Sequence, residues 1–294
     1  MKLLDGKLIS DQIKSEIAAQ VKNEMLDNGI NTPHLAAILV GSDPASETYV
    51  ASKERACKEA GFISSVYRYP AAITENKLME AVDFLNKDPE IDGFIVQLPL
   101  PAHINEHKII ERINPAKDVD GFHPINIGRM VLNLPAFLPA TPYGIMILLE
   151  RYGIETEGKN CVVLGRSHTV GTPMSLLLSR KTNPGNATVT LCNSFTRNLK
   201  EITSRADILI AAMGKPSFVT ADFVKKDAVV VDVGIHRILS EETKSGYRLI
   251  GDVKFDEVSK KCSYITPVPG GVGLMTVAGL LLNTLKAARK EIQY

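Results

Sequence analysis

VVLGRSHTVGTPM, residues 162–174, joins an apolar strand to a helix through a turn that begins and ends in glycine. Gly165 permits a tight turn, and Gly171 lets the helix approach the sheet. A turn of this kind directs backbone N–H groups and a helix N-terminus toward a pyrophosphate. Ser167 replaces the usual middle glycine, so the stretch is a variant of GxGxxG. Taken alone, it also fits a plain strand-to-helix turn.

The residues that follow favour the dinucleotide interpretation. Three short apolar runs come after the turn, at 187–192, 206–214 and 228–234, and each predicts a buried parallel strand. A strand, a glycine turn, a helix and further strands form the pattern of a Rossmann-type dinucleotide-binding domain. The sequence therefore predicts an α/β fold here.

The end of the second strand in this half indicates the cofactor. Enzymes that bind NAD usually place Asp or Glu there, to hold the ribose 2′-hydroxyl. This chain has CNSFTR (192–197), with hydroxyls on Ser194 and Thr196, and Arg166 lies in the glycine turn. A serine with an arginine suits a 2′-phosphate, which predicts NADP. The alternative is that Ser194 only caps the next helix.

The first half of the chain also alternates helices and strands. Ser10 and Gly29 suggest the two ends of a first helix. The later predicted elements are strands at 35–41, 63–69 and 93–101 and helices at 44–61 and 75–86. Residues 114–140 carry four prolines and no clean periodicity, and they predict a domain junction.

We therefore expect two domains with a cleft between them. Residues 1–140 plus 274–294 form the first, because the last helix is expected to pack back on it, and residues 141–273 form the Rossmann domain.

The helix at 44–61 carries a candidate catalytic group. Ser46, Tyr49 and Lys53 are spaced i, i+3 and i+7, so they share one face. Lysine shifts its pKa readily when it is desolvated and can then act as a base. Lys58 and Glu59 show that this helix also has a solvated face, and spacing alone favours that simpler interpretation for the three residues as well.

Polar residues follow the third strand. Gln97 stands at its carboxyl end, where ligands bind in open α/β sheets. Asp118 and Asp120 resemble the start of a calcium loop, but Phe122 occupies the next ligand position, so no metal is expected. A loop carboxylate such as Asp120 could instead accept two parallel N–H bonds from a planar heterocycle.

A glycine pair precedes the last helix, in PVPGGVG (267–273). Gly270 and Gly271, next to Pro267, allow the backbone to press against a flat ligand. The alternative is a simple entry from loop to helix.

The composition excludes several classes of protein. Lys and Arg number 34 against 33 Asp and Glu, so no electrostatic reason exists to expect a nucleic acid or membrane partner. No apolar run is long enough to span a bilayer, and the N-terminus does not resemble a signal peptide. Four scattered cysteines fit a reduced, cytoplasmic setting.

His103 and His107 have i, i+4 spacing but no third ligand, so we interpret them as surface histidines.

Taken together, these segments resemble the bifunctional methylenetetrahydrofolate dehydrogenase/cyclohydrolase family, known in bacteria as FolD. The resemblance runs nearly end to end. The motifs that carry it are SETYVASKERACKEAGF (46–62), GFIVQLPLP (93–101), KDVDGFHPINIGRM (117–130), PATPYGI (139–145), VVLGRSHTVGTPM (162–174), ADILIAAMG (206–214) and TPVPGGVGLMT (266–276). Where the family usually has CHSxT, this chain has CNSFT, with Asn193 and Phe195 beside the retained Ser194 and Thr196.

The resemblance implies a reaction in one-carbon metabolism. NADP oxidises 5,10-methylenetetrahydrofolate to the methenyl form, which is then hydrolysed to 10-formyltetrahydrofolate. It implies that Lys53 serves the hydrolysis, that Tyr49 packs on the folate, that Gln97 tunes the lysine and that Asp120 grips the pterin. The implied cofactor positions are Arg166, Ser167, Ser194 and Ile235. It also implies a homodimer.

Three other functions compete. The chain could be a dehydrogenase without hydrolase activity, although Tyr49, Lys53 and Gln97 are all present. It could be a cofactor-binding regulatory protein without turnover, but its catalytic face is undamaged. It could be another Rossmann dehydrogenase, acting on an amino acid or a shikimate-like acid, but such an enzyme should lack these long proline-rich motifs.

Overall fold

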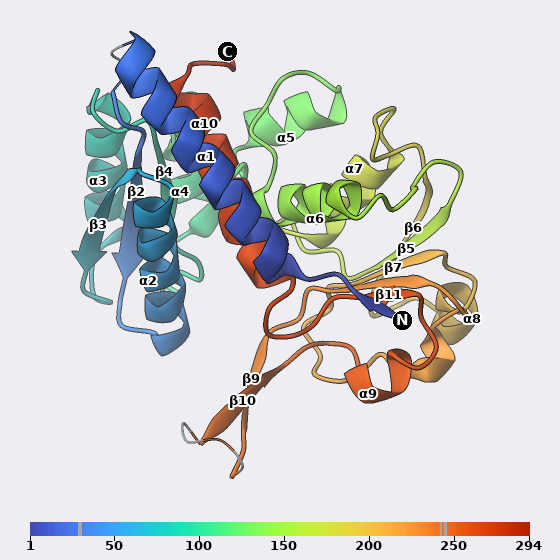
Figure 1. Cartoon of the computed structure of the whole chain (residues 1–294). Helices are drawn as coiled ribbons and strands as arrows, with labels where there is room; N and C mark the ends of the chain where they lie inside the picture. Colours follow the sequence, from blue (N-terminus) through green and yellow to red (C-terminus); the bar gives the residue numbers. More distant parts are fainter. Residues whose placement is uncertain (29–30, 242, 244–245) are drawn as a thin grey trace. The chain divides into compact units, whose positions relative to one another are not determined.

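The computed structural model describes residues 1–28, 31–241, 243 and 246–294, which form two units (Figure 1). Unit 1 contains Met1–Ser10 and Thr141–Thr276, and unit 2 contains Asp11–Ala140 and Val277–Tyr294. The placement of one unit relative to the other is not determined, so the cleft between them stays a prediction.

Unit 1 is built on a six-stranded sheet in which all neighbouring strands are parallel. In sheet order the strands are β1 (Lys2–Leu3), β11 (Tyr264–Ile265), β8 (Val229–Asp232), β7 (Ile208–Ala211), β5 (Asn160–Leu164) and β6 (Thr188–Cys192). The chain passes from β5 to β6 on one side and then to β7 on the other, so the strand order reverses at β5. Ligands of open α/β sheets bind at such a reversal, beyond the carboxyl ends of the strands.

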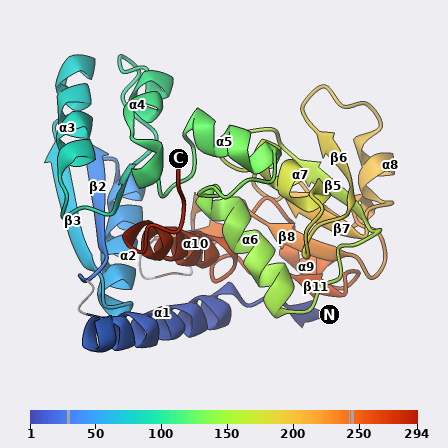
Figure 2. The same ribbon diagram turned by 90° about the horizontal axis from the view of Figure 1, so that it is seen from above.

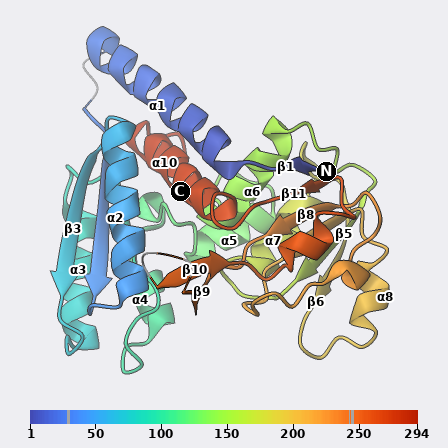
Figure 3. The same cartoon turned by 60° about the horizontal axis from the view of Figure 1, so that its bottom comes forward.

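Helices cover both faces of this sheet. Figures 1 and 3 show α6 and α7 on one face and α8 and α9 on the other. The bounds are α6 (Ala140–Arg151), α7 (Gly171–Ser179), α8 (Leu199–Thr203), the 3-10 helix η2 (Ala221–Phe223) and α9 (Phe255–Val258). An antiparallel hairpin of β9 (His236–Leu239) and β10 (Tyr247–Ile250) follows β8. Core strands β7 and β8 are buried throughout, as their apolar runs predict.

Unit 2 contains a three-stranded parallel sheet with the order β3-β2-β4. The strands are β2 (His34–Val40), β3 (Ile63–Tyr69) and β4 (Gly93–Val96). Ala36, Ile38 and Val40 pack with Leu78 and Ile109 in a buried cluster beneath α3 (Glu75–Lys87) and α4 (Glu106–Arg112). Helix α2 (Pro44–Glu59) lies against the opposite face, as Figures 2 and 3 show.

The first and last long helices are continuous across the unit boundaries: α1 is Gly6–Asn28 and α10 is Val272–Ala288. The prediction that Ser10 caps the first helix is wrong. Asp5 performs that role, because its carboxylate accepts a hydrogen bond from the Leu8 amide at 3.0 Å, and Ser10 is buried inside the helix. Gly29, the predicted end, lies outside the described residues.

Two segments differ from their sequence-based expectations. Residues 1–10 were expected with the first domain, but they lie in unit 1, where the Leu4 amide donates to the Ile265 carbonyl at 2.8 Å beside the β1–β11 pair. A two-residue strand carries no periodic signal. Residues 114–140 are less irregular than expected, because they contain η1 (Pro115–Lys117) and α5 (Pro124–Val131).

Candidate active site and cofactor turn

Lys53 and Gln97 meet in unit 2. Helix α2 starts at Pro44, capped by Asp43, whose carboxylate accepts from the Ser46 amide at 2.8 Å. Lys53 Nζ, in the middle of that helix, donates to Gln97 Oε1 at 3.1 Å. Gln97 directly follows β4, and its own Nε2 donates to the Leu98 carbonyl at 2.8 Å. That second bond turns the amide so that its oxygen faces the lysine.

Burial and a neighbouring carboxylate act on Lys53 in opposite directions. Burial lowers the pKa of the Lys53 ammonium, and the negative charge of Asp120 opposes this by raising it. Conversely, burial raises the pKa of the Asp120 carboxyl, while the charge of Lys53 lowers it and that of Asp118 raises it. Lys53, Gln97 and Asp120 therefore form one coupled group, which the sequence places 23 or more residues apart.

The two aspartates of the KDVDG motif are bonded differently. Asp118 is buried, and its carboxylate accepts from the Phe122 amide (3.3 Å), the His123 amide (2.8 Å) and Asn126 Nδ2 (2.8 Å). Among the described residues, none donates a hydrogen bond to the Asp120 carboxylate. Asp118 therefore holds the loop, and Asp120 is left with acceptor capacity for a ligand.

Ser46 and Tyr49 lie on the same helix as Lys53. Ser46 is buried, whereas the Tyr49 side chain is 38% exposed, which leaves the ring available to stack on a flat ligand. Burial raises the pKa of the Tyr49 phenol, so it stays protonated at neutral pH. Lys58 and Glu59 are exposed. The solvated face of this helix is thus not the one that carries Ser46 and the half-buried Lys53.

The glycines of the 162–174 stretch are required by close contacts within unit 1. Gly165 has a φ of +103°, and a Cβ there would lie 2.0 Å from the Ala212 carbonyl oxygen. A Cβ on Gly171 would lie 2.0 Å from the Gly165 oxygen. Ser167 Oγ accepts from the amides of Val170 (3.2 Å) and Gly171 (3.3 Å), so it closes the turn. The residues present fit a turn that a pyrophosphate can approach.

Arg166 and Ser194 are both exposed near this turn. The Arg166 guanidinium lies over the Phe195 ring, 5.9 Å from its centroid, and the Phe195 side chain is 82% exposed. Helix α8 begins at Leu199 with Asn198 before it, so Ser194 does not cap that helix. The Ser194 hydroxyl after β6 and the Arg166 guanidinium in the glycine turn fit a 2′-phosphate, and the CNSFTR stretch (192–197) contains no carboxylate that would repel it.

The remaining predicted residues also lie in unit 1. Gly270 has a φ of +103°, and a Cβ on Gly271 would lie 2.5 Å from the Pro267 oxygen, so this loop is folded tightly before α10. Ile235 follows β8, and its side chain is 39% exposed. A Cβ on Gly273 would lie 3.0 Å from Ile235 Cδ1.

Neither a metal site nor a membrane-spanning helix occurs among the described residues. None of the His, Cys, Asp and Glu side chains there form a group of three or more that could hold a metal ion. His103 Nε2 is bonded to the Ile73 carbonyl oxygen at 2.8 Å. Within the same part of the chain, every helix is too short or too polar to cross a bilayer. The four cysteines are buried and free.

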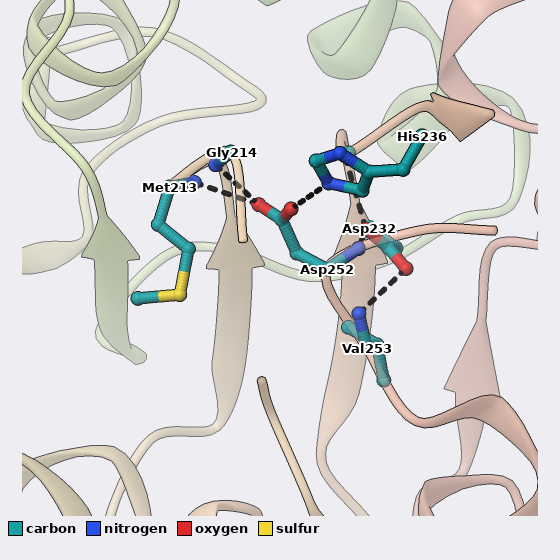
Figure 4. Close-up of polar contacts among 7 residues, drawn as sticks. Met213, Gly214, Asp232, His236, Asp252 and Val253 are labelled. Atoms are coloured by element: carbon teal, nitrogen blue, oxygen red, sulfur yellow. Dashed lines mark hydrogen bonds and ion pairs between the residues drawn. The ribbon is translucent and has the colours of Figure 1, made fainter. Parts of the chain in front are cut away.

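Sequence reasoning missed a polar cluster in unit 1 that Figure 4 shows. It contains Asp232 and Asp252, which are buried, and His236. The one available signal was Asp232 inside the apolar run AVVVDVG (228–234). Asp252 follows an exposed hairpin, and nothing local indicates that it is buried.

Comparisons with known proteins agree with this geometry. The family model described as the tetrahydrofolate dehydrogenase/cyclohydrolase catalytic domain matches residues 4–120, and that of the NAD(P)-binding domain matches residues 139–292. The bifunctional protein FolD of Cytophaga hutchinsonii is 64% identical over 288 residues, which cover 98% of this chain and 99% of that protein.

Two solved structures are similar over nearly the whole chain. The FolD methylenetetrahydrofolate dehydrogenase/cyclohydrolase of Campylobacter jejuni has 48% identity and a TM-score of 0.92, covering 99% of this chain and 100% of that one. The Trypanosoma brucei enzyme, solved with NADP cofactor and an inhibitor, has 36% identity and a TM-score of 0.92, covering 99% and 98%. This chain belongs to the tetrahydrofolate dehydrogenase/cyclohydrolase family.

Proposed function

We propose that this chain uses NADP to oxidise 5,10-methylenetetrahydrofolate to the methenyl form and then hydrolyses that product to 10-formyltetrahydrofolate. The observation that carries the proposal is the coupled group in unit 2, in which Lys53 Nζ donates to Gln97 Oε1 at 3.1 Å and the nearby Asp120 carboxylate receives no hydrogen bond from the described residues. The family relationship supplies the substrate class.

Hydrolysis requires a proton acceptor, and Lys53 is the candidate. Water adds to the carbon between the two folate nitrogens and gives one proton to the neutral Lys53 amine. The bond from that carbon to N5 then breaks as the ammonium returns a proton to N5, and the second water proton leaves as the formyl carbonyl forms. Gln97 Oε1 takes one N–H of the lysine, which orients the nitrogen lone pair.

Substrate binding falls to the residues around Lys53. Asp120 has unused acceptor atoms, which suit the adjacent N–H groups of a pterin. The half-exposed Tyr49 ring offers a stacking surface, with Ser46 on the same helix face. We further assign Pro267, Gly270 and Gly271 to the substrate loop, as the family resemblance implies.

Oxidation needs mainly positioning, because two nitrogens already activate the reacting carbon. When bound, NADP would supply the hydride acceptor for that carbon. The Gly165–Gly171 turn with Ser167 is assigned to the pyrophosphate, Arg166 and Ser194 to the 2′-phosphate, and Ile235 to the nicotinamide side. Unit 1 would then be the NADP domain and unit 2 the folate domain.

We extend the proposal to a cytoplasmic homodimer. The four free, buried cysteines support a reducing compartment, and the family resemblance supports the dimer. Light scattering on the purified chain measures the oligomeric state directly. Absorbance assays separate the competing functions, because decay of the methenyl compound without cofactor reports hydrolysis, and reduction of NADP or NAD with methylenetetrahydrofolate reports oxidation.

Lys53→Met tests the hydrolytic role. The methionine keeps a long, partly apolar side chain but cannot accept a proton, so we expect hydrolysis to fall at least about 100-fold. Lys58→Met on the exposed face of the same helix is the matched control and should retain the wild-type rate. Circular dichroism checks that both variants fold. Full hydrolysis by a folded Lys53→Met chain would remove Lys53 from the mechanism.

A further inference from the structure

Asp252 is a fully buried carboxylate that joins two loops of unit 1 (Figure 4). Its Oδ2 accepts hydrogen bonds from the backbone amides of Met213 at 2.7 Å and Gly214 at 3.0 Å. Its Oδ1 is bonded to His236 Nε2 at 2.7 Å. One side chain thus ties the loop after β7 to the first residue of the β9–β10 hairpin.

Asp232 adds a second buried carboxylate to the same cluster. Its Oδ1 accepts from the amides of Gly234 at 3.0 Å and Asp252 at 2.9 Å, and its Oδ2 accepts from the amide of Val253 at 2.9 Å. The two aspartates therefore hold the residues on both sides of Ile235, since Asp232 accepts from the Gly234 amide and Asp252 is bonded to the His236 side chain. Every carboxylate oxygen has a donor, so the arrangement is specified by hydrogen bonds.

The cluster leaves no space for other side chains. A Cβ on Gly234 would lie 2.4 Å from Asp252 Oδ1, and a Cβ on Gly251 would lie 1.8 Å from Asp232 Oδ2. The backbone at these two glycines is therefore pressed directly onto the carboxylates. Any side chain at either glycine would therefore displace the loop or the carboxylate it faces.

The loops held in this way lie at the cofactor end of the sheet. β7 and β8 are neighbouring parallel strands, and the cluster fixes the residues just beyond their carboxyl ends. β5, which leads into the Gly165 turn, is the other neighbour of β7. The Ala212 carbonyl, next to Met213, is the atom that excludes a Cβ from Gly165. The cluster thus contacts the dinucleotide turn through one residue.

We infer that His236 and Asp252 are positioning residues for oxidation: their hydrogen bond sets the Ile235 backbone and the Met213–Gly214 loop against the Gly165 turn, where the nicotinamide half of the cofactor binds. The inference rests on the proposed function and its cofactor site. Hydride transfer depends steeply on the geometry of the reacting atoms, so loosening this bond should slow oxidation. Hydrolysis uses Lys53 in unit 2 and no cofactor, so it should not respond.

The test compares His236→Phe with His236→Gln. Phenylalanine keeps a ring but removes the donor to Asp252, whereas the glutamine amide can place an N–H near the position of Nε2. His103→Phe, at an exposed histidine of unit 2, is the control. Each chain is assayed for kcat and KM with NADP, for hydrolysis of the methenyl compound without cofactor, and for melting temperature.

We expect His236→Phe to lose at least about tenfold in kcat/KM for oxidation while hydrolysis stays within about twofold of wild type. His236→Gln should recover most of the oxidation rate, and His103→Phe should match wild type. Unchanged oxidation by a folded His236→Phe chain would overturn the inference. So would loss of both activities with earlier melting, because His236 would then serve stability alone. A wild-type chain that reduces no NADP would overturn the proposed function as well, which distinguishes the two failures.

Discussion

The two units bury ionisable groups in opposite ways. In unit 1, the carboxylates of Asp232 and Asp252 each receive three hydrogen bonds. In unit 2, the Asp120 carboxylate receives none from the described residues, and Lys53 Nζ donates to Gln97. Both sets lie near the carboxyl ends of parallel strands, so position in the fold does not explain the difference.

We interpret the difference as one between groups that hold the chain and groups that we propose act on a ligand. A buried carboxylate with all its acceptor sites filled fixes loops and has no remaining capacity for substrate. A half-buried lysine and carboxylate, each shifting the other's pKa and the carboxylate without a donor among the described residues, have the properties expected of groups that transfer protons or bind a ligand. Asp118 and Asp120 repeat this contrast within one motif.

The largest expected effect is on the free energy of unfolding, when a carboxylate that holds loops (Asp252) and one without donors among the described residues (Asp120) are removed in separate variants. Asp252→Ala leaves the buried amides of Met213 and Gly214 without an acceptor, so we expect the free energy of unfolding to fall by about 4 kcal/mol. Asp120→Ala leaves no donor unpaired among the described residues and should change it by less than about 1 kcal/mol. Urea unfolding of both variants measures the difference. Equal losses would mean that the two carboxylates serve the same purpose.

A smaller effect is expected from the protonation of Asp232. Burial raises the pKa of Asp232 from 3.8 to about 6, although hydrogen bonds from Val253, Asp252 and Gly234 lower it. Because the folded state binds this proton more tightly than the unfolded state, ionisation costs the fold about 3 kcal/mol above pH 6, and the cost is relieved as the pH falls from 6 toward 3.8.

Asp232→Asn does not titrate, so it is the reference for that effect. The unfolding free energy of wild type minus that of the variant should increase by up to about 3 kcal/mol between pH 7 and pH 4. Urea unfolding at several pH values gives this difference. A difference that decreases toward pH 4 would show that the hydrogen bonds outweigh burial and that the ionised form is favoured in the fold.

The fold was largely predictable because its signals are local. Apolar runs such as 35–41 and 228–234 predict the core strands, and Pro44 with Gly61 marks the limits of α2. The Gly165 turn was also readable, since a tight turn needs glycine at fixed spacing. Segments without such a pattern were not predicted: the two-residue strand β1 exists only through its pairing with β11.

The residues of the candidate site and their roles stay predictions, and the structure adds the contacts around them. Lys53, Gln97 and Asp120 were named from their motifs and from the family resemblance, which already assigned the pterin to Asp120. The sequence could not show why Asp118 differs, because its donors come from residues 122–126 and are set by the fold of the loop. The Asp252 cluster could not be predicted, because its partners at Met213 and Asp232 lie 39 and 20 residues away and carry no shared pattern.

The most direct test of the account is the titration of Lys53 itself, followed by NMR of labelled lysine and assigned by the signal that Lys53→Met removes. Burial should place the pKa of Lys53 below the ordinary 10.5 of a lysine. Asp120→Asn should lower that pKa further, because it removes the negative charge that raises it. A Lys53 pKa at or above 10.5, or one that rises in Asp120→Asn, would contradict the claim that unit 2 prepares this lysine as a base.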